Sequence, residues 1–319
     1  MTDNSLHSAY VLQPRTNLIT DLVMGRLIPA PIWQKRNYRL KFLLRTALFY
    51  TPTRLMLDNL AARPNFSQLL AAQATLPGKV HRQYLRRGLN AGQRSAAIVS
   101  HYQYIDTLPA SRLSAAMTAV QEMPLLELQG KDDSRFTISA SSAGKAEREG
   151  ETTLWLRDGS QTVLASATFS VVREQEQWQL TIGGLQGPRR NVPHEAIKQA
   201  TRACYGLFPK RLLLEFIWAL AAQSNIRAIY GVSDNGHVFR ALRYRLSKGR
   251  HFHASYDEFW KSIEGAADGA WRWRLPLRLE RKSLDEIASK KRAEYRRRFQ
   301  LLDELNARVI ALAAGSSQA

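Results

Sequence analysis

The chain has 319 residues, and its 46 Lys and Arg against 27 Asp and Glu give a formal net charge of +19. Hydrophobic residues make up 45% of the sequence and charged residues 23%, which is ordinary for a globular protein and excludes a disordered, collagen-like or heptad-repeat chain. A charge this positive favours anionic partners, whether nucleic acid, phospholipid head groups or phosphorylated small molecules, without choosing among them.

The single cysteine, Cys204, excludes an intramolecular disulfide and a cysteine-based metal site, which fits a reducing compartment. We expect no secretory signal at the N-terminus, because residues 1–5 do not start a basic stretch followed by an apolar one. The longest apolar stretch, residues 212–222, is interrupted by Glu215 and is shorter than the roughly 20 residues of a membrane-spanning helix. We therefore expect a cytoplasmic location, with peripheral binding at the inner membrane as an alternative.

The first third of the chain predicts helices. Between residues 31 and 60, apolar side chains recur every three to four positions with basic side chains between them. Asn65 is expected to begin a short helix and Asn90 a longer one. We predict a helical N-terminal region over residues 1–120.

The periodicity changes near Pro124, where apolar and polar residues begin to alternate as in strands. Residues 152–156 and 163–172 flank an Asp-Gly turn and predict a hairpin, and residues 178–185 predict a further strand. These segments predict an antiparallel sheet in the middle of the chain.

A helix is expected over residues 194–205, and Pro209 opens a second, strongly apolar helix. Residues 226–233 predict the next strand, so that strands 178–185 and 226–233 would be parallel neighbours joined by a helix. We predict an α+β fold with a mixed, mainly antiparallel sheet, whose α/β core spans residues 121–280.

The last part of the chain is basic. Residues 236–244 predict a short helix, and a long terminal helix is expected from Ser283, where Ser283 and Glu286 have the spacing of a capping box. Residues 281–319 would then form a basic C-terminal helix and tail.

Motifs for common enzyme classes are absent: the sequence has no Walker A, His-Glu-x-x-His, Cys-x-x-Cys or Gly-x-Ser-x-Gly pattern. His251 and His253 form a close pair, which would need Asp257 or Glu258 to complete a metal site. Partly exposed polar side chains are the simpler interpretation, and we predict no metal site.

Two glycine-containing segments, residues 183–190 and 206–211, predict an anion site. Free backbone amides at the start of a helix, beside cationic side chains, bind phosphates. Arginine adds bidentate phosphate contacts. The alternative is that these glycines only turn the chain before Pro209 begins a helix. The predicted ligands of the anion are Gln186, Gly187, Arg189, Arg190, Lys210 and Arg211.

The order of strands and helices over roughly residues 124–246 resembles the core of the Gcn5-related N-acetyltransferase superfamily. This resemblance implies acyl-coenzyme A as a cofactor, held by the strand, loop and helix between residues 178 and 222. It also implies that strand amides polarise the thioester carbonyl, and that a tyrosine after the next strand protonates the leaving thiolate. Tyr244 is the positional candidate, with packing as the alternative role.

Two more side chains are candidates for acid–base catalysis. Glu215 could act as a base through water, although a salt bridge with Arg211 one turn earlier explains it equally simply. His237 is a further candidate acid or base.

A second resemblance covers most of the chain. Residues 185–187 (Leu-Gln-Gly), 206–213 (Gly-Leu-Phe-Pro-Lys-Arg-Leu-Leu), 232–238 (Val-Ser-Asp-Asn-Gly-His-Val) and 290–298 (Lys-Lys-Arg-Ala-Glu-Tyr-Arg-Arg-Arg) are similar to the VirK/YbjX family of bacterial proteins. That resemblance implies a role in envelope integrity, resistance to antimicrobial peptides and virulence, and it supplies no catalytic residues. We therefore expect a protein that acts on an envelope-related acceptor through an acyltransferase-like domain.

The densest basic region offers a non-enzymatic alternative. It could bind nucleic acid, although no helix-turn-helix, zinc-finger or RNP signature accompanies it, or it could bind an anionic phospholipid surface. A solvated helix face is the simplest interpretation. The region comprises Arg281, Lys282, Lys290, Lys291, Arg292, Arg296, Arg297 and Arg298.

Overall fold

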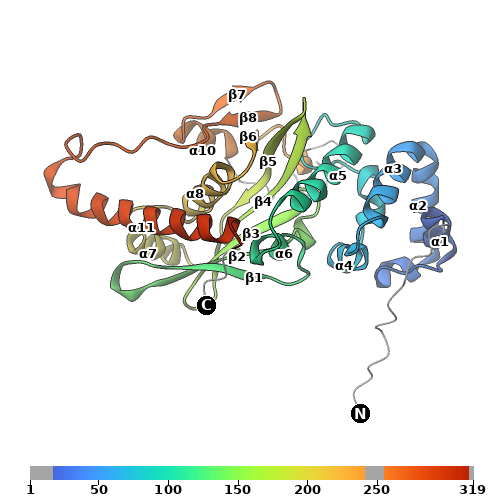
Figure 1. The fold of residues 1–319 in the computed structure, drawn as a ribbon, viewed down its shortest axis with the longest axis horizontal. Helices are drawn as coiled ribbons and strands as arrows, with labels where there is room; N and C mark the ends of the chain where they lie inside the picture. The colour runs from blue at the N-terminus through green and yellow to red at the C-terminus, as the bar shows by residue number, and fades with distance from the viewer. Residues whose placement is uncertain (1–16, 241–254, 316–319) are drawn as a thin grey trace, which may run out of the picture.

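A computed structural model describes residues 17–240 and 255–315, and an eight-stranded sheet forms its centre (Figure 1). The strand order in the sheet is β1-β2-β3-β4-β5-β6-β8-β7. The strands are β1 (Met123–Gln129), β2 (Arg135–Ser142), β3 (Thr152–Asp158), β4 (Val163–Glu174), β5 (Gln177–Gln186), β6 (Ile226–Val232), β7 (Ala266–Asp268) and β8 (Arg272–Leu275).

Strands β1 to β5 pair in chain order, each antiparallel to the next. Strand β6 is parallel to β5, and the chain between these two strands contains α7 (His194–Ala203) and α8 (Pro209–Ala222). Strand β8 then pairs antiparallel with β6, and β7 with β8. The predictions of a mixed, mainly antiparallel sheet and of a parallel strand–helix–strand unit are both confirmed.

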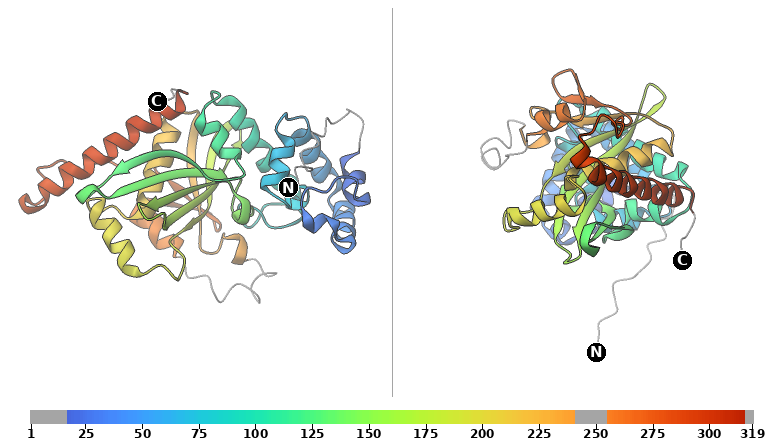
Figure 2. Two further views of the ribbon diagram at one scale, coloured as in Figure 1. Left: turned by 90° about the horizontal axis from the view of Figure 1, so that it is seen from below. Right: turned by 90° about the vertical axis from the view of Figure 1, so that its left-hand side faces the viewer.

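Helices precede the sheet in the chain; the first of them lie at one end of the molecule, and the last two pack against the sheet (Figures 1 and 2). Two short 3-10 helices, η1 (Pro31–Gln34) and η2 (Leu76–His81), lie among them. Asn90 caps α5 through the backbone N–H of Gln93, as the sequence predicts. The helices are α1 (Leu18–Met24), α2 (Arg36–Leu48), α3 (Tyr50–Ala61), α4 (Phe66–Ala72), α5 (Ala91–Thr107) and α6 (Arg112–Thr118).

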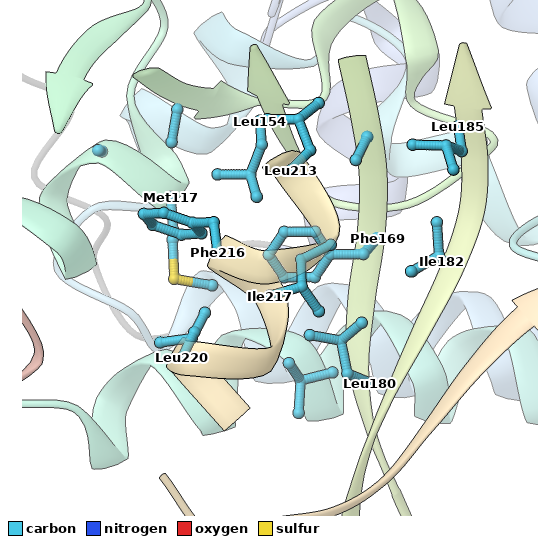
Figure 3. Packing of buried hydrophobic residues seen from close by; sticks show 14 of the residues in the cluster. Met117, Leu154, Phe169, Leu180, Ile182, Leu185, Leu213, Phe216, Ile217 and Leu220 are labelled. Carbon is cyan, nitrogen blue, oxygen red and sulfur yellow. The ribbon is translucent and has the colours of Figure 1, made fainter. Parts of the chain in front are cut away.

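Helix α8 is apolar on nearly every side because it packs between the sheet and the C-terminal helix α11 (Ser289–Ala313). Figure 3 shows Ile217 of α8 beside Phe169 of β4, and Phe216 on the other side of the helix beside Met117 of α6. All four side chains are buried, which fixes α8 against the sheet.

The connection between β2 and β3 carries three glutamates at alternate positions, Glu147, Glu149 and Glu151, which we call the glutamate segment. Glu147 accepts a hydrogen bond from Thr75, just before η2. Glu149 and Glu151 are buried and are bound by other parts of the chain. The end of this connection is therefore buried, and Glu147 and Glu151 both bind residues in or beside η2.

Glu151 is the centre of a buried polar network that joins the N-terminal helices to the sheet. Lys79 Nζ of η2 lies 2.6 Å from Glu151 Oε1 and donates to Gln73 Oε1 at 2.6 Å. Tyr102 OH of α5 donates to Glu151 Oε2 at 2.8 Å, as does the Gln73 side-chain amide. Burial lowers the pKa of Lys79, and the charge of Glu151 opposes that shift.

Two boundaries differ from the sequence prediction. Helix α11 begins at Ser289 rather than Ser283; the backbone N–H of Ser283 instead donates to the Glu286 carboxylate in a local turn. The helix expected over residues 236–244 is only the 3-10 turn η5 (Val238–Arg240) in its described part. A capping pattern can stabilise an isolated turn as well as a helix, so it placed the start of α11 too early.

One cluster of buried hydrophobic side chains contains members from all three predicted regions, for example Leu57, Phe169 and Leu305. The division at residues 120 and 280 stays a prediction.

Candidate functional site

Strands β5 and β6 separate before β5 ends. Their ladder stops at the pair Ile182 and Gly231, whereas β5 continues to Gln186. Gly183 is the extra residue of a bulge opposite β4, since Phe169 pairs with Ile182 and Thr168 with Gly184. We call the space between residues 183–186 of β5 and the chain that follows β6 the β5–β6 fork.

Aromatic rings occupy the inner part of the fork. Tyr256, of α10 (Tyr256–Ser262), accepts the Leu185 N–H at 3.2 Å, and Trp260 Nε1 donates to the Val232 carbonyl at 2.8 Å. The ring of His237 stacks on Tyr256 with centroids 5.5 Å apart, and Tyr256 stacks on Trp260 at 6.1 Å. All three rings are buried, and those of Tyr256 and Trp260 form hydrogen bonds with strand backbone groups in the fork.

Burial raises the pKa of the Tyr256 phenol, with a further rise from the Glu149 charge. The phenol therefore stays protonated at neutral pH, and it can accept the strand N–H without becoming an anion.

Glu149 closes the fork from the glutamate segment. Its Oε1 lies 3.2 Å from His237 Nε2, and the Gln186 amide donates to both of its oxygens, at 3.0 and 3.1 Å. His237 Nδ1 accepts the Phe239 N–H at 3.3 Å, so the whole pattern fits a ring protonated at Nε2.

The glycines of β5 make room for this carboxylate. A Cβ on Gly183 would overlap the Glu149 backbone carbonyl, and a Cβ on Gly184 would overlap the Glu149 carboxylate. The two glycines therefore serve a close approach of the glutamate segment to β5.

Lys210 lies at the mouth of the fork, at the second position of α8. Its Cε would be 3.8 Å from a Cβ on Gly187, and its Nζ lies 5.9 Å from the ring centre of Phe259. Burial lowers the pKa of Lys210. Within residues 17–240 and 255–315 its ammonium has no ion pair or hydrogen bond. A half-buried cation beside an exposed glycine loop is suited to an anionic ligand.

The neighbouring Arg211 has a different role. Its guanidinium contacts Glu215 Oε1 through Nε at 2.9 Å and Nη2 at 2.6 Å, and it lies 4.7 Å from the ring centre of Trp218. Glu215 and Trp218 line a groove of about 830 Å³ that also involves α11 and residues 277–281. Arg211 and Glu215 thus form a salt bridge on one face of α8, whereas the Lys210 side chain lies on another face, near Gly187.

The other predicted ligands lie in or near the loop after β5. Gln186, Gly187, Arg189 and Arg190 are all exposed, and of these Gln186 is bound to Glu149. The predicted proton donor Tyr244 lies outside the described residues, as do His251 and His253. Across the described ranges, no group of three or more His, Cys, Asp or Glu could hold a metal ion. In the same ranges no helix has the length and apolarity required to cross a membrane.

Sequence reasoning missed Glu149 and Tyr256, which shape the fork. Their partners are far away in the chain, so no local sequence pattern predicts that they belong to the site. The one available signal is the alternation of three glutamates around Gly150, which is unusual for a solvent loop.

Comparison with known proteins gives a family. The profile described as "Protein of unknown function (DUF535)" matches residues 31–311. The Escherichia coli K12 "Uncharacterized protein YbjX" is 35% identical over 299 residues, which cover 94% of this chain and 90% of that protein. Two Haemophilus influenzae proteins, each named "Uncharacterized protein", are 28% identical, over 68% and 70% of this chain and 70% and 71% of their own lengths. No solved structure matches.

Proposed function

The chain belongs to the DUF535 family, the VirK/YbjX-type proteins, and on that premise we propose that it binds an acyl thioester at the β5–β6 fork and transfers the acyl group. The donor would be acyl-coenzyme A or an acyl group on a carrier. The acceptor would be an amine or hydroxyl of an envelope-related molecule, consistent with the roles that the VirK/YbjX resemblance implies.

One observation carries this proposal: β5 extends past its pairing with β6 and leads into a glycine loop beside Lys210, whose ammonium has no ion pair or hydrogen bond among the described residues. The loop and the first turn of α8 would bind the phosphates of the donor, with Gln186, Gly187, Arg189 and Arg190 near the same loop. The exposed end of β5 would then be next to the thioester.

The reaction has a simple balance. The acceptor nitrogen or oxygen attacks the thioester carbonyl carbon and loses a proton, the carbon–sulfur bond breaks, and the thiolate leaves and takes up a proton. Since Tyr256 already accepts the Leu185 N–H, a backbone N–H of the loop that starts at Gly187 would stabilise the developing oxyanion. Tyr244 stays our proposed proton donor to the thiolate.

His237 and Glu149 are assigned to positioning. Both ring nitrogens of His237 are hydrogen-bonded, and both His237 and Glu149 are buried, which keeps them from direct contact with a substrate. Glu215 is likewise engaged by Arg211, which argues against its use as a base.

Calorimetric titration with acetyl- and long-chain acyl-coenzyme A tests the proposal, with ATP as a polyanion of similar charge. We expect an acyl-coenzyme A to bind selectively and to stay bound as salt is raised, because recognition would involve more than phosphate charge. Equal, salt-sensitive binding of all three would contradict the proposal.

Lys210→Ala should weaken donor binding about tenfold through loss of a charge-assisted contact. Lys198→Ala is the matched control, because Lys198 is an exposed lysine of α7 whose ammonium lies 3.9 Å from Glu195. Equal effects of the two substitutions would show that Lys210 contributes only to general charge.

A polyanion-binding role is the second candidate. Of the basic residues of α11, Arg298 is held by the Tyr205 carbonyl and Arg292 by the Ile287 carbonyl. Four exposed cations, Lys290, Lys291, Arg296 and Arg297, have no ion pair among the described residues. Steeply salt-dependent RNA binding, lost when these four are changed to Gln, would favour this role; RNA binding that the substitutions leave unchanged would exclude this helix.

A further inference from the structure

Helix α2 is apolar on two opposite faces. Phe42 and Thr46, one turn apart, are buried against the rest of the N-terminal region. Leu40, Leu44 and Leu48, also one turn apart, point the other way and are 54%, 60% and 78% exposed. Core packing explains the first face and leaves the second without a partner within the described chain.

Exposed apolar side chains gather at this end of the protein. Nine of the 13 large hydrophobic side chains that are exposed in the described ranges lie between residues 24 and 55. Scattered exposed leucines are normal in soluble proteins, whereas a local group marks an interaction surface. We call Leu40, Leu43, Leu44 and Leu48 the leucine ridge.

The surroundings of the ridge are basic. Helix α2 contains four Lys or Arg and no Asp or Glu, and residues 17–63 contain eight Lys or Arg against two Asp. Arg36 and Lys41 are exposed on α2 beside the leucines, and Arg39 and Arg45 lie at the borders of the buried face. An apolar ridge between cations is complementary to a surface whose charge is negative and whose interior is apolar.

We propose that the leucine ridge docks the protein on an anionic phospholipid bilayer. The leucines would enter the boundary between head groups and acyl chains, and Arg36 and Lys41 would bind lipid phosphates. A second copy of the chain is a poorer occupant, because two faces of the same positive sign would meet. Nucleic acid is also poorer, because it offers phosphates to the cations but no apolar layer to the leucines.

This surface is separate from the basic part of α11. Figures 1 and 2 show α2 in the helical group at one end of the molecule and the start of α11 at the other end. Docking through α2 leaves the sheet, α8 and α11 away from the lipid. The membrane contact proposed for the leucine ridge does not involve the basic C-terminal residues, and it does not depend on the acyl-transfer proposal.

Cosedimentation of the full-length protein with vesicles tests the proposal. We expect binding to vesicles containing phosphatidylglycerol and much weaker binding to vesicles of phosphatidylcholine alone. Leu44→Glu combined with Leu48→Glu should weaken binding to the anionic vesicles at least roughly tenfold, because two charges replace the inserted side chains. Both positions are exposed, so an unchanged thermal unfolding temperature is expected.

Val120→Glu is the control, since Val120 is 54% exposed and lies outside the ridge; it should bind vesicles as the unchanged protein does. Leu44→Ser with Leu48→Ser provides a second variant without added charge. Arg36→Gln with Lys41→Gln should reduce binding at low salt and have little further effect at high salt.

Three results would overturn the proposal. The unchanged protein could fail to bind phosphatidylglycerol vesicles at low salt. The leucine variants could bind as well as the Val120 control, which would place the contact elsewhere. Analytical ultracentrifugation could show a dimer that the leucine variants dissociate, with no vesicle binding by either, which would make the ridge a self-association surface.

Discussion

The buried pair of Lys79 and Glu151 gives the sharpest prediction for stability. Replacing Glu151 with Gln keeps the shape of the side chain but removes the charge that faces the Lys79 ammonium at 2.6 Å. Lys79 would keep the Gln73 side chain, the Gly150 carbonyl and the Tyr84 ring as partners, none of which carries a negative charge. Both members of the pair are fully buried, so water cannot replace the lost carboxylate.

Breaking such a pair by removing one partner costs about 3–5 kcal/mol. That is a large part of a typical free energy of unfolding of about 5–15 kcal/mol. Urea unfolding followed by circular dichroism should show a lower midpoint for Glu151→Gln with the slope unchanged. Lys79→Met combined with Glu151→Gln should cost less than the sum of the two single substitutions, because no unpaired charge remains.

Asp58→Asn is the control, since Asp58 forms an exposed i,i+4 pair with Arg54 at 3.3 Å. It should leave the urea midpoint nearly unchanged, because an exposed ion pair is solvated and screened. If Glu151→Gln costs as little as Asp58→Asn, and the double variant is additive, the buried network does not contribute as the geometry implies.

Three further outcomes are expected. Burial, with smaller effects of the Lys79 and Arg63 charges, lowers the pKa of His101 to about 3. Below pH 6.5, His101 is therefore protonated in the unfolded chain but stays neutral in the folded protein. Stability should therefore fall by about 2 kcal/mol between pH 7 and pH 5, and His101→Gln should remove this part in urea titrations at the two pH values. Gly184→Ala should lower the unfolding temperature in calorimetry, because the methyl group overlaps the Glu149 carboxylate, whereas Gly187→Ala should not; equal temperatures would mean that the fork adjusts freely. Burial raises the pKa of the Cys204 thiol to about 12, so a thiol reagent at pH 8 should label the protein only after unfolding, and rapid labelling of the folded protein would contradict this.

Local patterns predicted most of the elements. Alternation located the strands of the central sheet, and the apolar helix after Pro209 with its flanking strands implied the parallel pair. Strand β8 was missed, because a four-residue strand rich in Arg and Trp has no alternation long enough to recognise. The boundary of α11 was missed for the opposite reason, since a genuine capping pattern at Ser283 stabilises only a turn.

The site was less predictable than the fold. Lys210 and the loop residues near Gly187 were named from their own sequence, and the structure brings them together. The alternative given for Glu215, a salt bridge with Arg211, follows from i,i+4 spacing and is present. The carboxylate of Glu149 could not be foreseen as a partner of His237, because 88 residues separate them and only the completed sheet joins them.

The glutamate segment makes the connection between β2 and β3 sensitive to length. An inserted or deleted residue would move each carboxylate by one position, so that a side chain now inside would point away from its partner. Glu147 binds Thr75, Glu149 binds His237 in the fork and Glu151 binds Lys79, so one such change would disturb all three contacts together. Most surface loops can be lengthened in evolution at little cost in stability, whereas this connection should not tolerate a change in length.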